Sequence, residues 1–310
     1  MPKSKGDKEY DVVIIGGGPA GLAAGLYTSR ARLSSLLIEK IAAGGSIVNA
    51  GWVENYPGFP QGISGIDLAD TMKEQATKYG LEILLAEVTG LELRGESKVV
   101  KSNDGNIVAK AVIIAGGSER NKLGVPGEDE YTGRGVAYCA VCDAAFFRDK
   151  PVAVVGGGNA AINEALHLSR FASKVVVIHR RQELRATRIV QEKVFAEPKI
   201  EFLWNTVVEA IEGETVVGRL RLHNVSTGEK STLDISGIFV ATGSRPNTDY
   251  LQGILSLDTT GAIIADENME TEIPGILVAG DIRSGSIRQV VAAAGDGATA
   301  AIYAEKFITE

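Results

Sequence analysis

Residues 12–21 read VVIIGGGPAG, an apolar run that ends in a glycine-rich loop. The β-branched residues of this run predict a buried strand, and the segment from Leu22 to Arg30 predicts a helix directly after the loop. A strand, a glycine loop and a helix in this order are typical of a dinucleotide-binding domain. The loop residues that we expect at a cofactor are Gly16, Gly18, Pro19, Ala20 and Gly21.

The glycines of this loop have the spacing GxGxxG, which suits a diphosphate. The ligand needs backbone N–H groups and a helix N-terminus pointed at it, and side chains would block its approach. A lone GxGxxG can also be only a flexible turn. The pattern returns at residues 152–161, VAVVGGGNAA, with a helix expected from Ile162 to Phe171. Two matches in the same context favour two nucleotide sites, the second with Gly156, Gly158, Asn159 and Ala161.

The residue at the end of the next strand indicates which nucleotide each loop binds. In the first half, the run from Leu36 to Ile38 ends at Glu39, whose carboxylate can accept both hydrogens of a ribose diol, as in FAD or NAD. The equivalent position in the second half is basic, with His179, Arg180, Arg181 and, nearby, Arg185. Cations there suit the 2′-phosphate of NADPH. The alternative is a solvated basic helix start.

Apolar strands alternate with helical patterns in both halves, which favours parallel sheets. A short apolar run ends at Gly280, far from the first loop, so we expect a C-terminal segment to complete the first domain. The predicted fold class is α/β, with two Rossmann-like dinucleotide-binding domains, the second inserted into a discontinuous first domain. We place the first domain at residues 1–118 and 248–310, and the second domain, which contains both cysteines, at residues 119–247.

The composition excludes several classes of protein. The net charge of −7 and the scattered Lys and Arg residues give no basic surface for nucleic acid. No apolar run approaches the length of a membrane span, and the stretch from Met1 to Glu9 is polar, without the apolar core of a signal peptide. With only two cysteines, a disulfide-stapled secreted domain is not expected either. We therefore expect a cytoplasmic protein that binds neither a membrane nor nucleic acid.

Both cysteines lie in one CxxC motif, Cys139-Ala140-Val141-Cys142. This spacing allows a small, reversibly closed disulfide ring, and a helix N-terminus can lower the thiol pKa in such a pair. A structural zinc site would need four Cys or His ligands, and a second pair is missing, so we expect no metal. A coincidental, unreactive pair is the other alternative. Asp143 follows directly and either protonates a departing thiolate or is only an acid in the first helical turn.

These motifs together resemble those of the low-molecular-weight thioredoxin reductases, in the pyridine nucleotide-disulfide oxidoreductase family, over essentially the whole chain. Further similar segments are residues 53–58 (VENYPG), residues 179–185, Gly280-Asp281, and Arg288-Gln289 before an alanine-rich helix. The resemblance implies an FAD-dependent thioredoxin-disulfide reductase, in which an NADPH-binding domain (residues 119–247) with the redox dithiol is inserted into a discontinuous FAD-binding domain (residues 1–118 and 248–310). It would pass electrons from NADPH through FAD and the Cys139/Cys142 dithiol to thioredoxin or a thioredoxin-like protein, which is a separate chain. The family is usually homodimeric.

The resemblance also implies roles for residues around the flavin. Asn55 and the backbone near Gln289 would contact the ring system, and Asp281 a ribityl hydroxyl. The other residues expected at the cofactors are Gly45, Gly116, Gly243, Gly280 and Arg288. The chain departs from the family's pattern at Ser46, where glutamine is usual, at Gly116, where threonine is usual, and at Ala144, where glycine is frequent.

Other functions remain open from the residues alone. The chain can instead reduce a glutaredoxin-like or peroxiredoxin-type partner, since no partner-specific residue is visible. A donor other than NADPH is a further alternative, which the second fingerprint and its arginines disfavour. A non-enzymatic alternative is a nucleotide-binding redox sensor.

Overall fold

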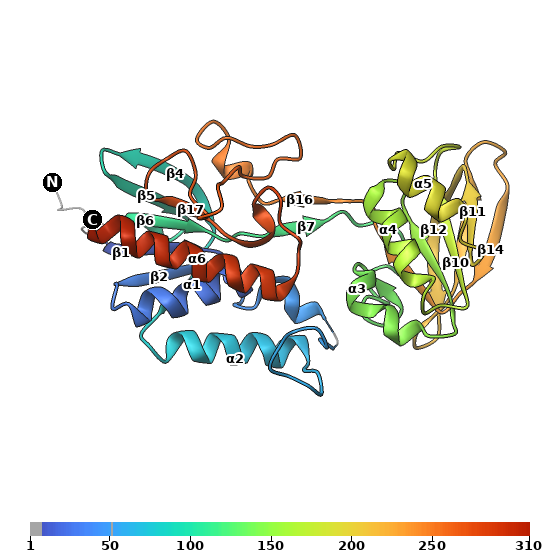
Figure 1. Cartoon of the computed structure of the whole chain (residues 1–310), viewed down its shortest axis with the longest axis horizontal. Helices are drawn as coiled ribbons and strands as arrows, with labels where there is room; N and C mark the ends of the chain where they lie inside the picture. Colours follow the sequence, from blue (N-terminus) through green and yellow to red (C-terminus); the bar gives the residue numbers. More distant parts are fainter. Residues whose placement is uncertain (1–7, 51) are drawn as a thin grey trace. The chain divides into compact units, whose positions relative to one another are not determined.

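The computed structural model describes residues 8–50 and 52–310 (Figure 1). Most of the polar stretch from Met1 to Glu9 therefore lies outside the described residues. The chain divides into two compact units, each of which is described by itself. Unit 1 is built from residues up to Glu119 together with Arg245–Glu310, and unit 2 is Arg120–Ser244.

Unit 1 contains a seven-stranded sheet with the order β3-β2-β1-β6-β5-β4, in which β17 also pairs with β6. The strands are β1 (Lys8–Ile15), β2 (Ser35–Glu39), β3 (Glu82–Leu85), β4 (Val88–Arg94), β5 (Ser97–Ser102), β6 (Gly105–Ile114) and β17 (Ile276–Val278). Strands β4, β5 and β6 form an antiparallel meander, and the other pairs are parallel. The last strand to be synthesised therefore lies inside a sheet begun by the first.

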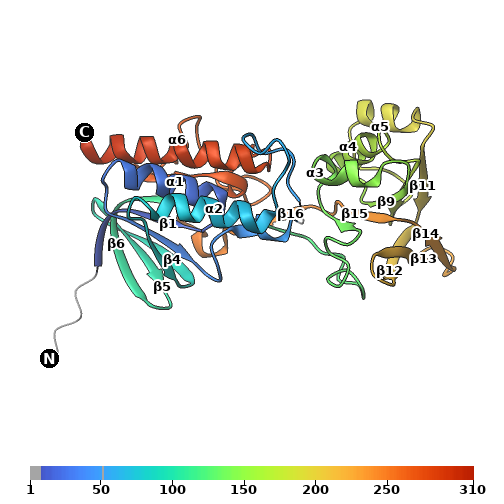
Figure 2. The same cartoon turned by 90° about the horizontal axis from the view of Figure 1, so that it is seen from below.

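Alternate residues of β1 fill two separate cores, as the period of a strand requires. Val12 and Ile14 face the helices α1 (Pro19–Arg30) and α6 (Val290–Thr309), which lie side by side (Figures 1 and 2). A Cβ at Gly297 of α6 would lie 2.0 Å from the Ala20 carbonyl oxygen, so only glycine allows this close approach. The other face, with Val13 and Ile15, packs on the C-terminal residues Leu251, Ile263 and Ile282. Helix α2 (Gly65–Thr77) completes the helical side.

Unit 2 contains a parallel five-stranded sheet with the order β11-β10-β9-β15-β8 and an antiparallel sheet with the order β12-β13-β14. The strands are β8 (Val136–Ala137), β9 (Pro151–Val155), β10 (Lys174–His179), β11 (Ile200–Trp204), β12 (Thr206–Gly213), β13 (Val217–Asn224), β14 (Lys230–Asp234) and β15 (Gly237–Val240). One face of the parallel sheet packs on helices α3 (Ala140–Asp143), α4 (Asn159–Leu168) and α5 (Arg188–Phe195). The other face packs on the antiparallel sheet.

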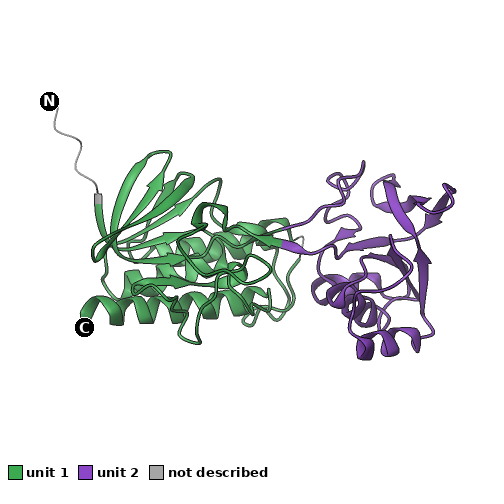
Figure 3. Ribbon diagram, turned by 90° about the horizontal axis from the view of Figure 1, so that it is seen from above, with its two compact units in different colours: residues 1–119, 245–310 green, residues 120–244 purple. Residues whose placement is uncertain are grey.

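The chain passes between the units twice (Figure 3). Two short strands at these passages, β7 (Ser118–Arg120) and β16 (Ser244–Pro246), pair with each other. The divisions fall after residues 119 and 244, where the sequence led us to expect 118 and 247. Within the described residues the 3-10 segments are η1 (Gly45–Asn49), η2 (Ala144–Phe147), η3 (Asp249–Leu251) and η4 (Gly280–Ile282). Along the described residues, no helix is both long and apolar enough to span a bilayer.

The α/β fold class with two parallel-sheet units is confirmed, but the expected helix starts were too late. Helix α1 begins at Pro19 and α4 at Asn159, three residues before the positions that we predicted. The reason lies in the loops. Gly18 and Gly158 are extended N-cap residues, so the next residue is already helical, and proline is well suited to the first helical position.

Candidate active site

The first glycine loop closes tightly on its neighbours. Gly16 has φ +105°, and a Cβ there would lie 2.4 Å from the Ala115 carbonyl oxygen. A Cβ at Gly21 would lie 1.9 Å from the carbonyl oxygen of Gly16, and one at Gly45 would lie 2.8 Å from Cα of Gly18. These contacts leave no room for side chains, which is what a loop that approaches a phosphate through its backbone needs.

Glu39 is tied directly to this loop. Its Oε2 accepts a hydrogen bond from the Gly17 N–H at 2.7 Å, and its Oε1 accepts one from Ile41 at 3.1 Å. The carboxylate therefore lies at the edge of the loop with a fixed orientation, as the spacing predicted. The ribose contact itself stays a prediction.

Both glycine loops end in helices that lack a side-chain cap. The N-caps of α1 and α4 are Gly18 and Gly158, and neither has a side-chain oxygen that could accept from the N–H groups of the first turn. Such N–H groups, together with the helix dipole, are ready to bind an anion. A Cβ at Gly158 would meet no atom within 4 Å, so the approach to α4 is open. The two loops thus fit the diphosphates of FAD and NADPH.

Residues from both ends of the chain meet in unit 1. Asn55 Nδ2 donates to Gln289 Oε1 at 3.1 Å, although the two are far apart in sequence. Asp281 lies in η4, and the preceding Gly280 presses on the loop, since a Cβ there would be 2.9 Å from Cβ of Ala20. At Gly116, a Cβ would be 3.8 Å from the hydroxyl of Tyr250, which is buried without a hydrogen-bond partner in the described structure. Gly45, Gly116 and Gly280 therefore lie against the first glycine loop, while Asn55 and Gln289 contact each other.

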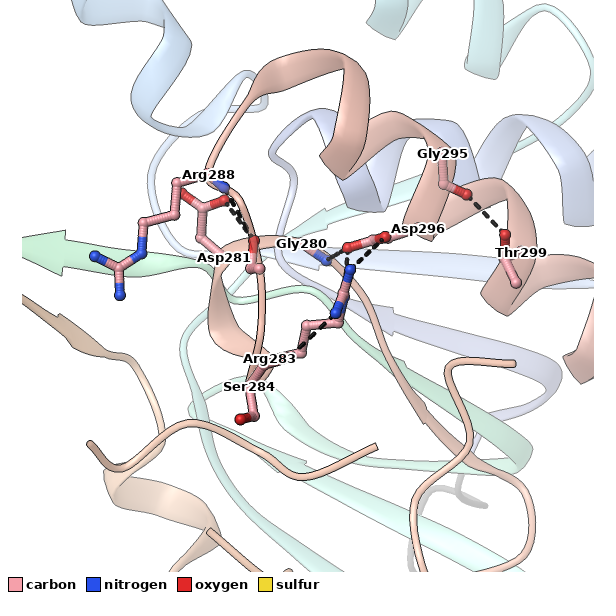
Figure 4. Close-up of polar contacts among 9 residues, drawn as sticks. Gly280, Asp281, Arg283, Ser284, Arg288, Gly295, Asp296 and Thr299 are labelled. Atoms are coloured by element: carbon pink, nitrogen blue, oxygen red, sulfur yellow. Dashed lines mark hydrogen bonds and ion pairs between the residues drawn. The ribbon is translucent and has the colours of Figure 1, made fainter. Parts of the chain in front are cut away.

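The sequence reasoning missed an ion pair behind this turn. Asp296 of α6 and Arg283 bind each other through two contacts, and Asp296 also accepts the N–H of Gly280 (Figure 4). The signal available in the sequence was a single acidic residue, Asp296, among the mostly small and apolar residues 290–304 of this helix.

The second glycine loop is bound to the basic segment that follows β10. The carbonyl of Gly157 accepts hydrogen bonds from the N–H groups of Arg185 at 2.7 Å and Ala186 at 3.2 Å. The Asn159 side chain accepts one from the Thr187 N–H at 2.8 Å. These bonds hold an arginine beside the loop at the point where the nucleotide ribose is expected.

His179 differs from the neighbouring arginines. Its side chain is buried, and a Cβ at Gly157 would lie 2.3 Å from its ring. Burial lowers the pKa of His179, while its Nε2 lies 3.1 Å from the Glu183 carbonyl oxygen. The sequence led us to expect a cation at this position, whereas the structure has a buried ring with a lowered pKa that packs against Gly157 of the loop. Arg180 and Arg181 are exposed and stay available to a phosphate.

Cys139 and Cys142 are joined by a disulfide, with a Cα–Cα distance of 5.4 Å. Cys139 is the N-cap of the short helix α3, and its sulfur accepts the N–H of Cys142 at 3.2 Å. The residues that follow α3, Ala144–Phe147, form the 3-10 segment η2. A backbone N–H aimed at the sulfur favours the thiolate form once the bond is reduced.

Two partly buried carboxyl groups accompany the disulfide in unit 2. Burial raises the pKa of Asp143 to about 6, against the opposing charge of Arg120. Burial likewise raises the pKa of Glu164 to about 7. The positive charge of Arg120 opposes this rise, and the carboxylate of Asp143 adds to it. Helix α3 contacts α4, which carries Glu164, and Oε2 of Glu164 is buried without a hydrogen-bond partner among the described residues. Asp143 is thus equipped to carry a proton near neutral pH.

The raised pKa of Glu164 makes a prediction for stability. An acid whose pKa is higher in the folded state destabilises the fold progressively as the pH rises from the acid's ordinary pKa of 4.5 past about 7. Glu164→Gln removes that ionisation. Its unfolding free energy, relative to the original protein, should therefore increase by about 2 to 3 kcal/mol across this window. Denaturant unfolding at both ends of the window measures the change.

Glu192→Gln is the matched control, because the Glu192 side chain is exposed on α5 and therefore stays hydrated in the folded protein. If the unfolding free energy increased already at low pH, or increased equally in both variants, the burial of the Glu164 charge would be contradicted.

No group of three or more His, Cys, Asp or Glu residues suited to a metal occurs among residues 8–50 and 52–310. The disulfide and the acid beside it, in the unit that also contains the second glycine loop, indicate a redox site.

Comparison with known proteins agrees with this chemistry. The sequence profile of the pyridine nucleotide-disulphide oxidoreductases matches residues 10–297. Thioredoxin reductase from Peptoclostridium acidaminophilum is 46% identical, over 96% of this chain and 97% of the relative. Thioredoxin reductase from Bacillus subtilis (strain 168) is also 46% identical, over 98% and 96%. A crystal structure of thioredoxin reductase from Streptococcus pyogenes MGAS5005 is 44% identical, covers 97% of this chain and 98% of its own, and has a TM-score of 0.93. The chain belongs to the pyridine nucleotide-disulphide oxidoreductase family.

Proposed function

We propose that this chain passes electrons from NADPH, through FAD and the Cys139–Cys142 pair, to the disulfide of thioredoxin. The observation that carries the proposal is the closed disulfide next to Asp143, an acid with a raised pKa, in the unit that also holds the second glycine loop. Two relatives at 46% identity over nearly the whole chain are thioredoxin reductases, which supports the proposal.

We assign FAD to unit 1 and NADPH to unit 2. The FAD residues are Gly16, Gly18, Pro19, Ala20, Gly21, Glu39, Gly45, Asn55, Gly116, Gly280, Asp281, Arg288 and Gln289. The NADPH residues are Gly156, Gly158, Asn159, Ala161, Arg180, Arg181, Arg185 and Gly243, with His179 supporting the loop from below. Bound FAD supplies the redox chemistry that links a two-electron hydride donor to a disulfide. The residues of the chain orient both nucleotides and manage the thiol protons.

Asp143 is the proposed general acid. Two electrons break the Cys139–Cys142 bond, and a departing thiolate takes up the proton that Asp143 holds below about pH 6. Asp143→Asn keeps the shape but cannot donate a proton in this way. The disulfide steps should slow by about a hundredfold, while flavin reduction by NADPH is unchanged. Rapid mixing resolves the two half-reactions.

The pH profile separates this role from a structural one. In the original protein, the disulfide step should slow as the pH rises through about 6, and Asp143→Asn should abolish that dependence. An unchanged profile in the variant would assign the proton to another group.

The direct test of the function starts from the visible spectrum of the purified protein, which reports bound flavin. Thioredoxin reduction is then measured with NADPH and NADH in parallel. Faster reduction of a glutaredoxin-like or peroxiredoxin-type substrate would move the proposal to that partner. Activity only with another electron donor would overturn NADPH as the donor. Nucleotide binding without turnover would indicate a redox sensor.

Two further parts of the proposal concern the cellular state. We propose a homodimer, as the family resemblance implies, and a cytoplasmic location, where reducing conditions allow a lone dithiol to cycle. Sedimentation of the purified protein tests the first, and fractionation of cells tests the second.

A further inference from the structure

Asp296 is an unusual residue in its helix. Over residues 290–304, helix α6 consists of apolar and small residues with one Thr and one Tyr, and Asp296 is its only charged side chain. It is buried, with 8% of the residue exposed. A charge in this position must be desolvated and therefore needs strong partners.

The partners of Asp296 come from one short segment. Arg283 donates from Nε to Oδ2 at 2.6 Å and from Nη2 to Oδ1 at 3.0 Å, a two-point contact that fixes both planar groups. The N–H of Gly280 donates to the same Oδ2 at 3.1 Å. Figure 4 shows the carboxylate between these donors, with Asp281 on the adjoining turn.

These contacts determine the geometry of residues 280 and 281. Gly280 has φ +80°, a conformation that other residues rarely adopt, and it lies against Ala20 in the first turn of α1. Asp281 follows in η4, and its Oδ1 lies 3.4 Å from the Ser286 hydroxyl. The side chain of Asp281 is therefore aimed by a turn whose preceding N–H is held by Asp296.

Packing alone does not explain the ion pair. Well-packed apolar residues stabilise a buried position at least as well as a desolvated ion pair does. A two-point ion pair with a third donor adds orientation, because only one placement of the turn satisfies all three bonds. The turn that it orients carries the residue assigned to the flavin ribityl chain.

We propose that Asp296 is a positioning residue for FAD. Together with Arg283 it holds the Gly280–Asp281 turn against the first glycine loop, and so sets the position in which Asp281 meets a ribityl hydroxyl. This inference rests on the proposed function, in which Asp281 binds FAD. It adds two residues that touch no nucleotide but control how long FAD stays bound.

The experiment measures FAD release from the holoprotein after dilution, followed by flavin fluorescence. Asp296→Asn keeps the shape of the side chain but loses the charge that binds Arg283. Release should become about tenfold faster or more, the effect of losing one charged hydrogen bond at a binding site. Arg283→Lys, which keeps the charge and loses the two-point contact, should give a smaller acceleration and serves if Asp296→Asn does not fold.

A double-mutant cycle separates positioning from general loosening. In an Asp281→Asn background, Asp296→Asn should accelerate release by less than about threefold, because the residue through which it acts is already changed. Thr299→Val is the matched control on the same helix, since the Thr299 hydroxyl, among the residues that the structure describes, bonds to Gly295 within α6. It should leave release unchanged.

The outcomes distinguish the two proposals. A purified protein without flavin would refute the proposed function itself. A flavin-loaded protein in which Asp296→Asn and Arg283→Lys release FAD at the original rate would overturn the positioning role alone. The positioning role would also be overturned if Asp296→Asn accelerated FAD release equally in the original protein and in the Asp281→Asn variant. Asp296 would then act independently of Asp281.

Discussion

Serine in place of either Cys139 or Cys142 is expected to abolish thioredoxin reduction, by about a thousandfold or more, because the exchange needs two thiols and serine is not a competent substitute. Reduction of FAD by NADPH should persist, since it needs no cysteine. Each variant thus keeps one half-reaction and loses the other. Anaerobic rapid mixing with NADPH measures the first, and turnover with oxidised thioredoxin the second.

The retained half-reaction is the internal control for these variants. It shows that both nucleotides still bind and that any loss lies in the thiol steps. Near-normal thioredoxin reduction by either serine variant would mean that the pair is not the route of the electrons.

Alanine at both Arg180 and Arg181 is expected to raise the KM for NADPH by about 10- to 100-fold for each lost contact. Both side chains are exposed, and the segment that follows them is bonded to the carbonyl of Gly157. A guanidinium binds the 2′-phosphate in two places and gains little from a free ribose diol. The KM for NADH should therefore change little, and the selectivity for NADPH should fall.

Arg170→Ala is the matched control, because Arg170 is exposed just after α4 and is not among the predicted nucleotide residues. Arg170→Ala should leave the KM for NADPH and the KM for NADH unchanged. If the double variant raised the KM for NADPH and NADH equally, the arginines would act on a part shared by both nucleotides and could not be the source of selectivity.

The parts of the fold that follow local rules could be predicted from the sequence. Glycine spacing after an apolar run identified both nucleotide loops, and Glu39 is bonded to the Gly17 N–H at the loop's edge. The run that ends at Gly280 led to the discontinuous layout, because a C-terminal segment was expected to complete the first domain, and β17 does pair with β6. These patterns reflect requirements of the backbone that depend on residues adjacent in the sequence.

The parts that depend on tertiary packing could not be predicted. His179 sits in a basic segment, yet its ring is covered by Gly157, which no local pattern reveals. Glu164 looks like an ordinary acid on a helix surface until α3 contacts that helix. Asp296 and Arg283 meet only because α6 lies on η4. In each case the deciding neighbour comes from another element.

The discontinuous construction of unit 1 also sets an order of events during translation. Unit 2 is one continuous segment and can fold as soon as it has left the ribosome, since domains generally fold as units while the chain grows. Unit 1 cannot, because β17 and α6, which fill its sheet and cover Val12 and Ile14, are made last. Its first strands must wait, with apolar faces and a strand edge exposed to aggregation. A nascent chain arrested before residue 276 should therefore contain a folded interior domain flanked by an incomplete one that depends on chaperones.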